Sequence, residues 1–195
     1  MALPKIVQAG TPVLRKPAAL VTSERFGSRE LKSLVATMIE VMRAAPGVGL
    51  AAPQIGVGLK VLVLEDREDL MARLSPDDRA ARGRVPFPVT AICNPELRKI
   101  GEARATFFEG CLSVGGYMAL VERHLEVEVL GYDELGEPVR IRTSGWPARI
   151  LQHEVDHLNG KLYVDRMLSR SFCSNEEAIH WVGRPVSEVR EALDV

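Results

Sequence analysis

Two histidines stand four residues apart in the sequence HEVDH at 153–157. The segment is predicted to be a helix from about Gly145 to about Leu158, because Pro147 suits a first helical turn. Residues four apart on a helix are neighbours, with roughly 5–6 Å between their Cβ atoms. Both imidazoles can therefore bind one metal ion, and the pattern predicts a metal site on one helix face. The alternative, two surface histidines that fit the pattern by coincidence, is disfavoured because the chain has only four histidines.

Glu154 lies between the two histidines, where it can take a proton from a water molecule at the ion. A catalytic site also needs a third protein ligand and one open position for water. In one class of zinc peptidases a third histidine follows six residues after the second, but Tyr163 stands there in this chain. A downstream glutamate, Glu176 or Glu177, could serve instead, as in thermolysin-like enzymes.

Cys111, upstream in the chain, is a better candidate for the third ligand. It lies between polar, flexible residues in the sequence EGCLSV at 109–114, whereas Cys93 lies in an apolar stretch typical of core packing. Cys173 has no supporting context. In a Cys/His/His set the thiolate would offset half the charge of a divalent ion. The residue pattern alone does not exclude the glutamates as the third ligand.

The composition narrows the classes of function. A net charge of -1 and 26% charged residues give no reason to expect sequence-specific nucleic acid as a partner. No apolar run approaches the length of a membrane span, and the N-terminus lacks the apolar core of a signal peptide. Three cysteines are an odd count that suits a reducing compartment, so a cytoplasmic protein is expected.

The remaining elements follow from hydrophobic periodicity and turn signals. Apolar residues at helical spacing predict an amphipathic helix from Ser28 to about Ala45, and the Gly-rich sequence at 47–54 predicts a tight loop or irregular strand. Charged residues at 65–88 predict an insertion, with one short helix at 67–74. Further predictions are an extended segment at 1–16, strands at 60–64, 89–94 and 103–108, a hairpin of 124–132 with 139–143, and a short helix at 185–193.

Three blocks resemble the signature motifs of peptide deformylases: GVGLAAPQ at 47–54, EGCLS at 109–113 and QHEVDH at 152–157. They match in order, in approximate spacing and nearly residue by residue, over residues 10 to about 168. One block alone would be weak, whereas the three together are highly specific. The sequence SGWPARI at 144–150 and the 65–88 insertion are more similar to the plant and animal organellar branch than to the common bacterial form.

The resemblance implies a metal site made by Cys111, His153 and His157, with water as fourth ligand. It implies one divalent ion, Fe²⁺ in the cell, with Zn²⁺, Ni²⁺ or Co²⁺ able to take the same site, and soft thiolate with imidazole suits more than one of these. Glu154 is implied as the general base. The Gln54 side-chain amide and the Leu112 backbone N–H are implied as donors to the developing oxyanion.

The resemblance also implies an extended substrate peptide that contacts the backbone of Gly49. Val48, Trp146 and Ile150 are candidates for an apolar pocket that holds the methionine side chain, although Trp146 is bulkier than the residue often found there. Gly115 and Met118 stand where bacterial relatives often carry Pro and a substrate-holding Arg. Arg123 is retained.

Together these inferences predict an α+β fold in a single domain over residues 1–195, with mixed, mainly antiparallel strands around a central helix that bears the HExxH motif. The predicted function is metal-dependent removal of the formyl group from N-terminal formylmethionine of new proteins. The expected partners are formylmethionyl peptides and nascent chains, with a transient ribosome contact and no membrane. The alternatives are a zincin-type metallopeptidase that uses Glu176 or Glu177, and a regulator with a closed, structural metal site.

Overall fold

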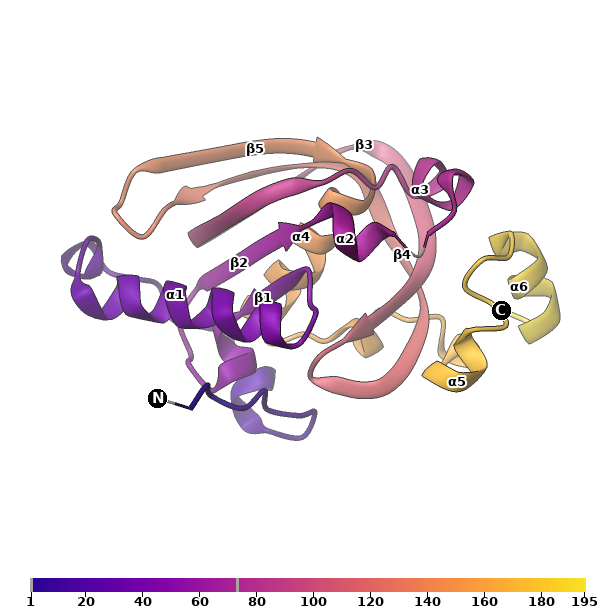
Figure 1. The fold of residues 1–195 in the computed structure, drawn as a ribbon, viewed down its shortest axis with the longest axis horizontal. Coiled ribbons are helices and arrows are strands. Elements are labelled where there is room, and N and C mark those ends of the chain that lie inside the picture. Colours follow the sequence, from indigo (N-terminus) through magenta and orange to yellow (C-terminus); the bar gives the residue numbers. More distant parts are fainter. Residues whose placement is uncertain (1, 73) are drawn as a thin grey trace.

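The computed structural model describes residues 2–72 and 74–195, so Met1 in the predicted extended segment and Arg73 in the predicted 67–74 helix lie outside the described residues. Helices and strands combine in an α+β fold, and a strongly curved sheet wraps around one helix, α4 (Figure 1). The first residues run along the outside of the fold, as the predicted extended segment requires, and include a 3₁₀ turn at Pro12–Arg15.

Within the described residues the sheet has six strands, and every pairing between named strands is antiparallel. The strands follow the order β1-β2-β3-β4-β5, and β6 pairs with β4. This agrees with the predicted mainly antiparallel sheet. The strands are β1 (Gly49–Ala51), β2 (Val61–Asp66), β3 (Phe87–Cys111), β4 (Val114–Tyr132), β5 (Pro138–Ser144) and β6 (Cys173–Ser174).

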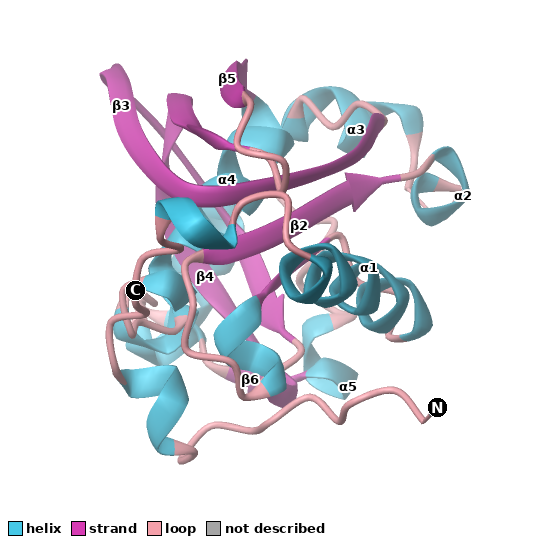
Figure 2. Ribbon diagram, turned by 90° about the vertical axis from the view of Figure 1, so that its left-hand side faces the viewer, coloured by secondary structure: helices cyan, strands magenta, loops and turns pink. Residues whose placement is uncertain are grey.

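The helices lie outside the sheet, with the exception of α4, which the strands surround (Figure 2). Over the described residues, no helix is both long and apolar enough to cross a membrane. The α-helices are α1 (Arg29–Ala44), α2 (Glu68–Met71), α3 (Pro76–Arg82), α4 (Gly145–Leu158), α5 (Asn175–Ala178) and α6 (Val186–Leu193).

Helix α1 forms where the periodicity predicts it. The Ser28 hydroxyl caps its N-terminus by accepting a hydrogen bond from the Leu31 N–H at 3.2 Å, which stabilises a helix by about 1 kcal/mol. The apolar stripe packs against β1 and β2. The side chains that it buries are Leu31, Val35, Met38, Val41 and Met42. Each contributes about 1.5–3 kcal/mol when it is fully withdrawn from water.

Strands β3 and β4 differ from the prediction. Residues 89–94 and 103–108 are parts of one strand, which bends through register shifts near Glu96 and Gly101. The partner strand begins at Val114, ten residues before the predicted start at His124. Gly115 and Gly116 hide this start in the sequence, because glycine is uncommon inside strands. The pairing with β3 holds the segment extended.

The predicted hairpin of 124–132 with 139–143 is confirmed as the distal part of β4 paired with β5. Its register runs from Tyr132 opposite Pro138 to Glu126 opposite Ser144. Helix α4 follows directly and contacts strands β1 to β5, so the residues on its faces reach several strands at once. The main core lies between α4 and the sheet, and it contains Leu62, Leu64, Ile92, Val127, Val129 and Leu151.

The segment between β2 and β3 contains two helices, whereas one was predicted. Helix α2 lies inside the predicted 67–74 range, and α3 was not expected, although Ser75 caps it by accepting from the Asp78 N–H at 3.1 Å. Three ion pairs stabilise the segment, and two of them are 2.7 Å long. Arg84 Nε lies 2.7 Å from Asp66 Oδ2, and Arg79 Nη1 lies 2.7 Å from Glu68 Oε1.

The C-terminal segment packs against the far end of β3 and β4 (Figure 1). Strand β6 pairs with β4 at Tyr117 and Met118, and the apolar face of α6 buries Val189. The predicted helix at 185–193 is confirmed as α6. This packing brings α5 to the mouth of the cavity described below.

Candidate metal centre and active site

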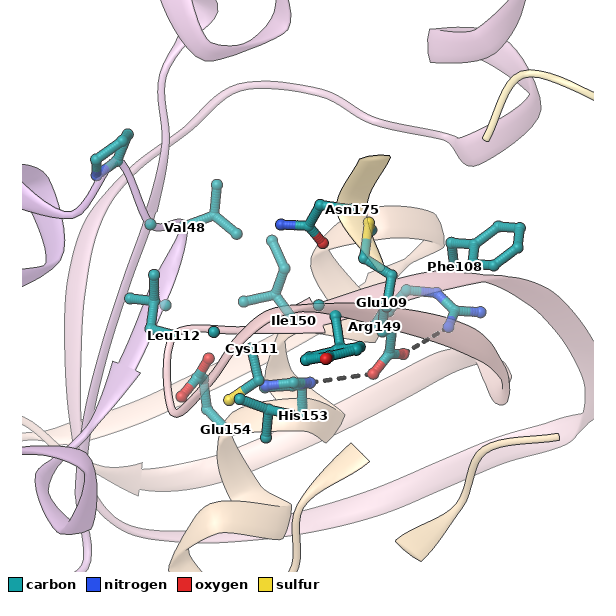
Figure 3. A pocket seen from close by; sticks show the side chains of 18 of the residues that line it. Val48, Phe108, Glu109, Cys111, Leu112, Arg149, Ile150, His153, Glu154 and Asn175 are labelled. Carbon is teal, nitrogen blue, oxygen red and sulfur yellow. Dashed lines mark hydrogen bonds and ion pairs between the residues drawn. The ribbon is translucent and has the colours of Figure 1, made fainter. Parts of the chain in front are cut away.

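A cavity of about 540 Å³ opens between β1, the β3–β4 turn, the start of α4 and the C-terminal segment. Most residues predicted to form the site line this cavity (Figure 3). They are Val48, Gly49, Gln54, Cys111, Leu112, Trp146, Ile150, His153 and Glu154. His157, the remaining one, lies behind Cys111 and is 1% exposed.

The side chains of Cys111, His153 and His157 converge at one point. Their ligand atoms all lie within 4.8 Å of one another, and Cys111 Sγ is 3.2 Å from His157 Nε2. Helix α4 supplies the two histidines one turn apart, and β3 ends at the cysteine. Thiolate and imidazole are ligands that Zn²⁺ and Fe²⁺ accept, so these three residues could hold one such ion.

The residues around this group also fit a metal. His153 Nδ1 lies 3.0 Å from Glu109 Oε2, which directs the other ring nitrogen toward the cluster (Figure 3). A carboxylate on the far nitrogen of a metal-binding histidine fixes its tautomer and ring orientation. Among the described residues, no further His, Cys, Asp or Glu side chain joins these three.

Glu109 also anchors a chain of buried charges. Arg123 donates two hydrogen bonds of 2.9 Å to the Glu109 carboxylate, and Arg149 Nη1 lies 2.5 Å from Oε1. Arg123 Nη1 also lies 2.5 Å from Asp156 Oδ2, which pairs with Arg166 at 2.6 Å. Burial alone would raise the pKa of Glu109, but Arg123 and His153 hold it well below its usual range. The network keeps Glu109 ionised and fixes His153.

Glu154 has a different environment. Its side chain is 4% exposed, and its Oε2 atom has no hydrogen-bond partner among the described residues. Burial raises the pKa of Glu154 to about 7. A carboxyl group with a pKa near neutrality can both accept and return a proton, which is what a general acid–base residue requires.

The Gln54 amide is fixed by the backbone of its own 3₁₀ turn. Its Oε1 accepts a hydrogen bond of 2.8 Å from the Ala51 N–H, so its Nε2 faces the cluster. Nε2 lies 3.7 Å from Cys111 Sγ and 3.4 Å from Ser113 Oγ. Leu112 follows the cysteine in the β3–β4 turn, and its carbonyl accepts a hydrogen bond of 3.0 Å from Gln8 Nε2. Both residues are thus held beside the predicted ligands.

Several residues of the site were not predicted from the sequence. Glu109 and Arg149 belong to the charge network, and Arg82, Arg84 and Asn175 line the cavity. Two of them lie in sequence blocks that the resemblance singled out, since Glu109 begins the EGCLS block and Arg149 belongs to SGWPARI at 144–150. Asn175 comes from α5, and Figure 3 shows its side chain facing the cavity.

Other candidates lie outside the metal cluster. Glu176 and Glu177 are exposed on α5, and His180 is exposed after it. His124 lies inside β4 rather than at a strand start, with 8% exposure. Gly115 and Met118 line the cavity, whereas Arg123 is buried in the charge network.

The comparisons with known proteins agree on a family. The polypeptide deformylase family model matches residues 3–172. Peptide deformylase 1A, chloroplastic, of Solanum lycopersicum is 53% identical over 171 residues, 88% of this chain and 62% of that protein. Peptide deformylase, mitochondrial, of Homo sapiens is 44% identical over 91% of this chain and 71% of that protein. The chain thus spans about three fifths of the length of the tomato relative.

A solved structure shows the same fold. The Met-ala-ser bound crystal structure of class I type b peptide deformylase from Acinetobacter baumannii superposes with a TM-score of 0.77 at 33% identity. The match covers 85% of this chain and 99% of that chain. With the family match over residues 3–172 and the shared fold, this chain belongs to the polypeptide deformylase family.

Proposed function

We propose that this chain removes the formyl group from N-terminal formylmethionine of newly made proteins and releases formate. The observation that carries the proposal is the convergence of Cys111, His153 and His157 within 4.8 Å, next to a buried glutamate with a carboxylate oxygen that has no hydrogen-bond partner among the described residues. The relatives are named peptide deformylases, and the related bacterial structure was solved with Met-ala-ser.

The family consists of metalloenzymes, and we propose that Cys111, His153 and His157 hold the ion. Fe²⁺ is the proposed ion in the cell, with Zn²⁺, Ni²⁺ or Co²⁺ as substitutes, because one thiolate and two imidazoles suit all four. When bound, such an ion supplies a Lewis acid that polarises a carbonyl and lowers the pKa of water. Elemental analysis after anaerobic purification tests the choice of metal.

Glu154 is the proposed general base. A carboxylate takes a proton from the attacking water and returns it to the amine that leaves when the formyl C–N bond breaks. Burial holds the pKa of Glu154 above its usual range in the metal-free chain, which supports a role as a residue that can carry a proton during the reaction.

Gln54 and Leu112 are the proposed donors to the oxyanion that develops on the formyl oxygen. The bond of Ala51 N–H to Gln54 Oε1, 2.8 Å long, orients the amide before substrate arrives. Preorganised donors of this kind lower the barrier because they do not reorient during the reaction. Removal of one such donor typically costs about 10²–10³ in kcat.

Val48, Gly49, Trp146 and Ile150 are the proposed substrate contacts. They line the cavity that contains the proposed metal ligands. Gly49 belongs to β1, a short strand beside which an extended peptide can add its own backbone hydrogen bonds. The other three are apolar or aromatic, which suits the unbranched thioether of methionine.

We propose that residues 1–195 act as one catalytic domain with an insertion at 65–88. The insertion supplies Arg82 and Arg84 to the cavity wall, which supports a role in the same site. Nascent chains carry the proposed substrate, and a transient ribosome contact stays a prediction that co-sedimentation can test.

A cytoplasmic location also stays a prediction. The chain has relatives named as chloroplastic and mitochondrial enzymes, so cell fractionation with organelle markers must decide the compartment.

The two rival functions are not favoured. A zincin-type peptidase would need Glu176 or Glu177 at the metal, but both side chains are exposed on α5. A purely structural site would need a fourth protein ligand, and among the described residues the cluster has three.

The deciding experiment compares three peptides at equal concentration: formyl-Met-Ala-Ser, acetyl-Met-Ala-Ser and an internally cleavable peptide. The proposal expects formate release and at least a roughly tenfold preference in kcat/KM for formyl over acetyl, because one extra methyl disturbs the near-attack geometry. Trp146→Leu should change the preference for the methionine side chain more than the preference for formyl. Internal cleavage without formate would overturn the proposal.

A further inference from the structure

Arg82 is a half-buried cation at the wall of the catalytic cavity. It ends helix α3, in the segment that was predicted to be an insertion. None of the ion pairs within 4.0 Å that the described residues form includes Arg82. Its guanidinium makes one long hydrogen bond, of 3.5 Å, to the Val182 carbonyl.

The other arginines around the same indole are neutralised. Three guanidinium groups lie over the Trp146 ring, those of Arg82 at 5.2 Å, Arg84 at 5.5 Å and Arg149 at 5.9 Å from its centroid. Arg84 binds Asp66 with two hydrogen bonds, of 2.7 and 2.9 Å, and Arg149 binds Glu109. Arg82 is thus the member of this cluster whose charge has no carboxylate partner among the described residues.

The fold holds Arg82 in place. A Cβ atom at Gly145 would lie 2.8 Å from the Gly83 oxygen and 2.9 Å from the Arg82 oxygen, so the end of α3 packs directly on the start of α4. The neighbouring Arg84–Asp66 pair ties the same turn to β2. The backbone at Arg82 is therefore held in place, and the guanidinium lies between the Val182 carbonyl and the Trp146 and Phe107 rings.

Withdrawal of a charge from water is unfavourable unless a partner compensates it. Burial lowers the pKa of Arg82, and the nearby carboxylate of Asp78 opposes this shift only in part. The Trp146 and Phe107 rings compensate in part, since a cation is attracted to the face of an aromatic ring. An anionic group of a ligand would complete the compensation.

The space beside Arg82 can accept such a group. A second cavity, of about 320 Å³, shares Arg82 and Phe108 with the catalytic cavity. Asp78 also lines the second cavity, one helical turn before Arg82, and its Oδ2 accepts a hydrogen bond of 2.7 Å from Ser75 Oγ. Arg82 therefore stands where the wall of the catalytic cavity continues into further space.

We propose that Arg82 is a specificity-determining residue that binds an acidic side chain in the substrate peptide, downstream of the formylmethionine. The inference rests on the proposed function. The formyl group and the methionine side chain carry no charge, so a carboxylate that reaches the cavity wall must come from a later residue. Arginine binds carboxylates in a planar, two-bond geometry, which gives specificity as well as attraction.

The test uses formyl-Met peptides with a C-terminal amide, which removes the terminal carboxylate. The side chain of the varied residue is then the only carboxylate in the peptide. Glu and Gln are compared at the second, third and fourth positions, and kcat/KM is measured for each pair. The wild-type protein should prefer Glu over Gln at one of these positions by roughly three- to tenfold, the range of a partly screened ion pair. Arg82→Gln should abolish that preference, and Arg82→Lys should retain part of it.

Arg98→Gln is the matched control. Arg98 is an exposed arginine on β3 that lines neither cavity, so its loss removes one positive charge without changing the Glu-to-Gln ratio. Equal rates for Glu and Gln at all three positions in the wild-type protein would overturn the inference. A preference that survives in Arg82→Gln would also overturn it.

The two proposals can fail separately. If no formyl peptide releases formate, the proposed function fails. Calorimetric binding of unformylated Met peptides with Glu or Gln then still tests Arg82. Equal affinities of the Glu and Gln peptides would reject the inference, whereas tighter binding of Glu that is lost in Arg82→Gln would support it.

Discussion

Gly49 and Glu154 are in direct contact, since a Cβ atom at Gly49 would lie 2.8 Å from Glu154 Cδ and 2.9 Å from Cγ. Strand β1 therefore runs against the side chain proposed as the general base. The close approach needs a residue without a side chain at this point of the strand. The position of the Glu154 carboxylate therefore depends on the backbone of β1, which forms part of the cavity wall.

Gly49→Ala is expected to push the Glu154 carboxylate out of place. The atoms that would clash belong to one side chain, so the variant should fold with at most about 1–3 kcal/mol lost and with its metal retained. A misplaced base should lower kcat by at least about tenfold. Steady-state kinetics and metal analysis check this. Gly58→Ala is the control, because its new Cβ would meet its nearest neighbour, Val13, at 4.0 Å. Unchanged kcat in Gly49→Ala would contradict the expectation.

Cys111→Ala should lose bound metal and activity together, because it removes one of three converging ligands. The double variant Glu176→Ala with Glu177→Ala should keep both, since those side chains are exposed. Metal stoichiometry after gel filtration and formate release are the measurements. The reverse pattern would favour the peptidase.

Glu154→Gln should keep about one equivalent of metal, because the residue is proposed as a base and not as a ligand. Its kcat should fall by at least about 10²-fold, the lower range for loss of a general acid–base group. Near-normal turnover with metal in place would show that another group moves the proton.

The pH dependence of stability offers an independent test of the Glu154 environment in the chelated, metal-free protein. The pKa of Glu154 is raised from its ordinary value of 4.5 to about 7 by burial. The folded chain therefore holds a proton that the unfolded chain releases between these values. This contribution is fully present below pH 4.5 and is lost as the pH rises through about 7.

The unfolding free energy of wild type minus that of Glu154→Gln should consequently fall by about 2–4 kcal/mol between pH 4.5 and pH 8. Urea unfolding curves at half-unit pH intervals measure the difference. Because Glu154→Gln keeps every other titrating group, the subtraction removes the contributions of those groups. A difference that does not vary with pH would mean that Glu154 is solvated in the metal-free protein.

Glu109→Gln should weaken metal binding about 10–100-fold, since Glu109 fixes the ring of His153 at 3.0 Å. It should also lower the unfolding free energy by about 3–5 kcal/mol, because Arg123 would keep a buried charge with fewer partners. Chelator competition and urea unfolding separate the two effects. Glu122→Gln, in an exposed pair with Arg104, should change stability by less than about 0.5 kcal/mol. Equal effects of the two variants would show that burial of Glu109 has no special role.

Local sequence determined the elements whose residues need only near neighbours. Helix α1 has its Ser28 cap and its apolar stripe within one segment, and the β4–β5 hairpin has its alternation and turn within one segment. Helix α4 was predicted in the same way. Its histidines carry a spacing that only a helix converts into a shared face. The ligand set with Cys111 came from the resemblance, since spacing alone left the glutamates open.

Tertiary structure decided what depends on residues far apart in the chain. The early start of β4 at Val114 depends on pairing with β3. The segments 89–94 and 103–108 join in one strand because β3 pairs with β4 from Cys93 to Cys111, through the residues between the two segments. Periodicity within a segment carries no information on such partners. Helix α3, between β2 and β3, was not predicted because its short, polar sequence has no apolar stripe.

The chemistry of the site divides in the same way. The sequence by itself supplied the residue types, namely a cysteine, two histidines and a glutamate in fixed spacing. Only the folded chain brought Glu109 to His153, Gly49 to Glu154 and Arg82 to Trp146. Ligand identity follows from the chemistry of a side chain, whereas orientation, pKa and charge balance follow from burial and from neighbours. Those neighbours come from segments that meet only when the sheet closes around α4.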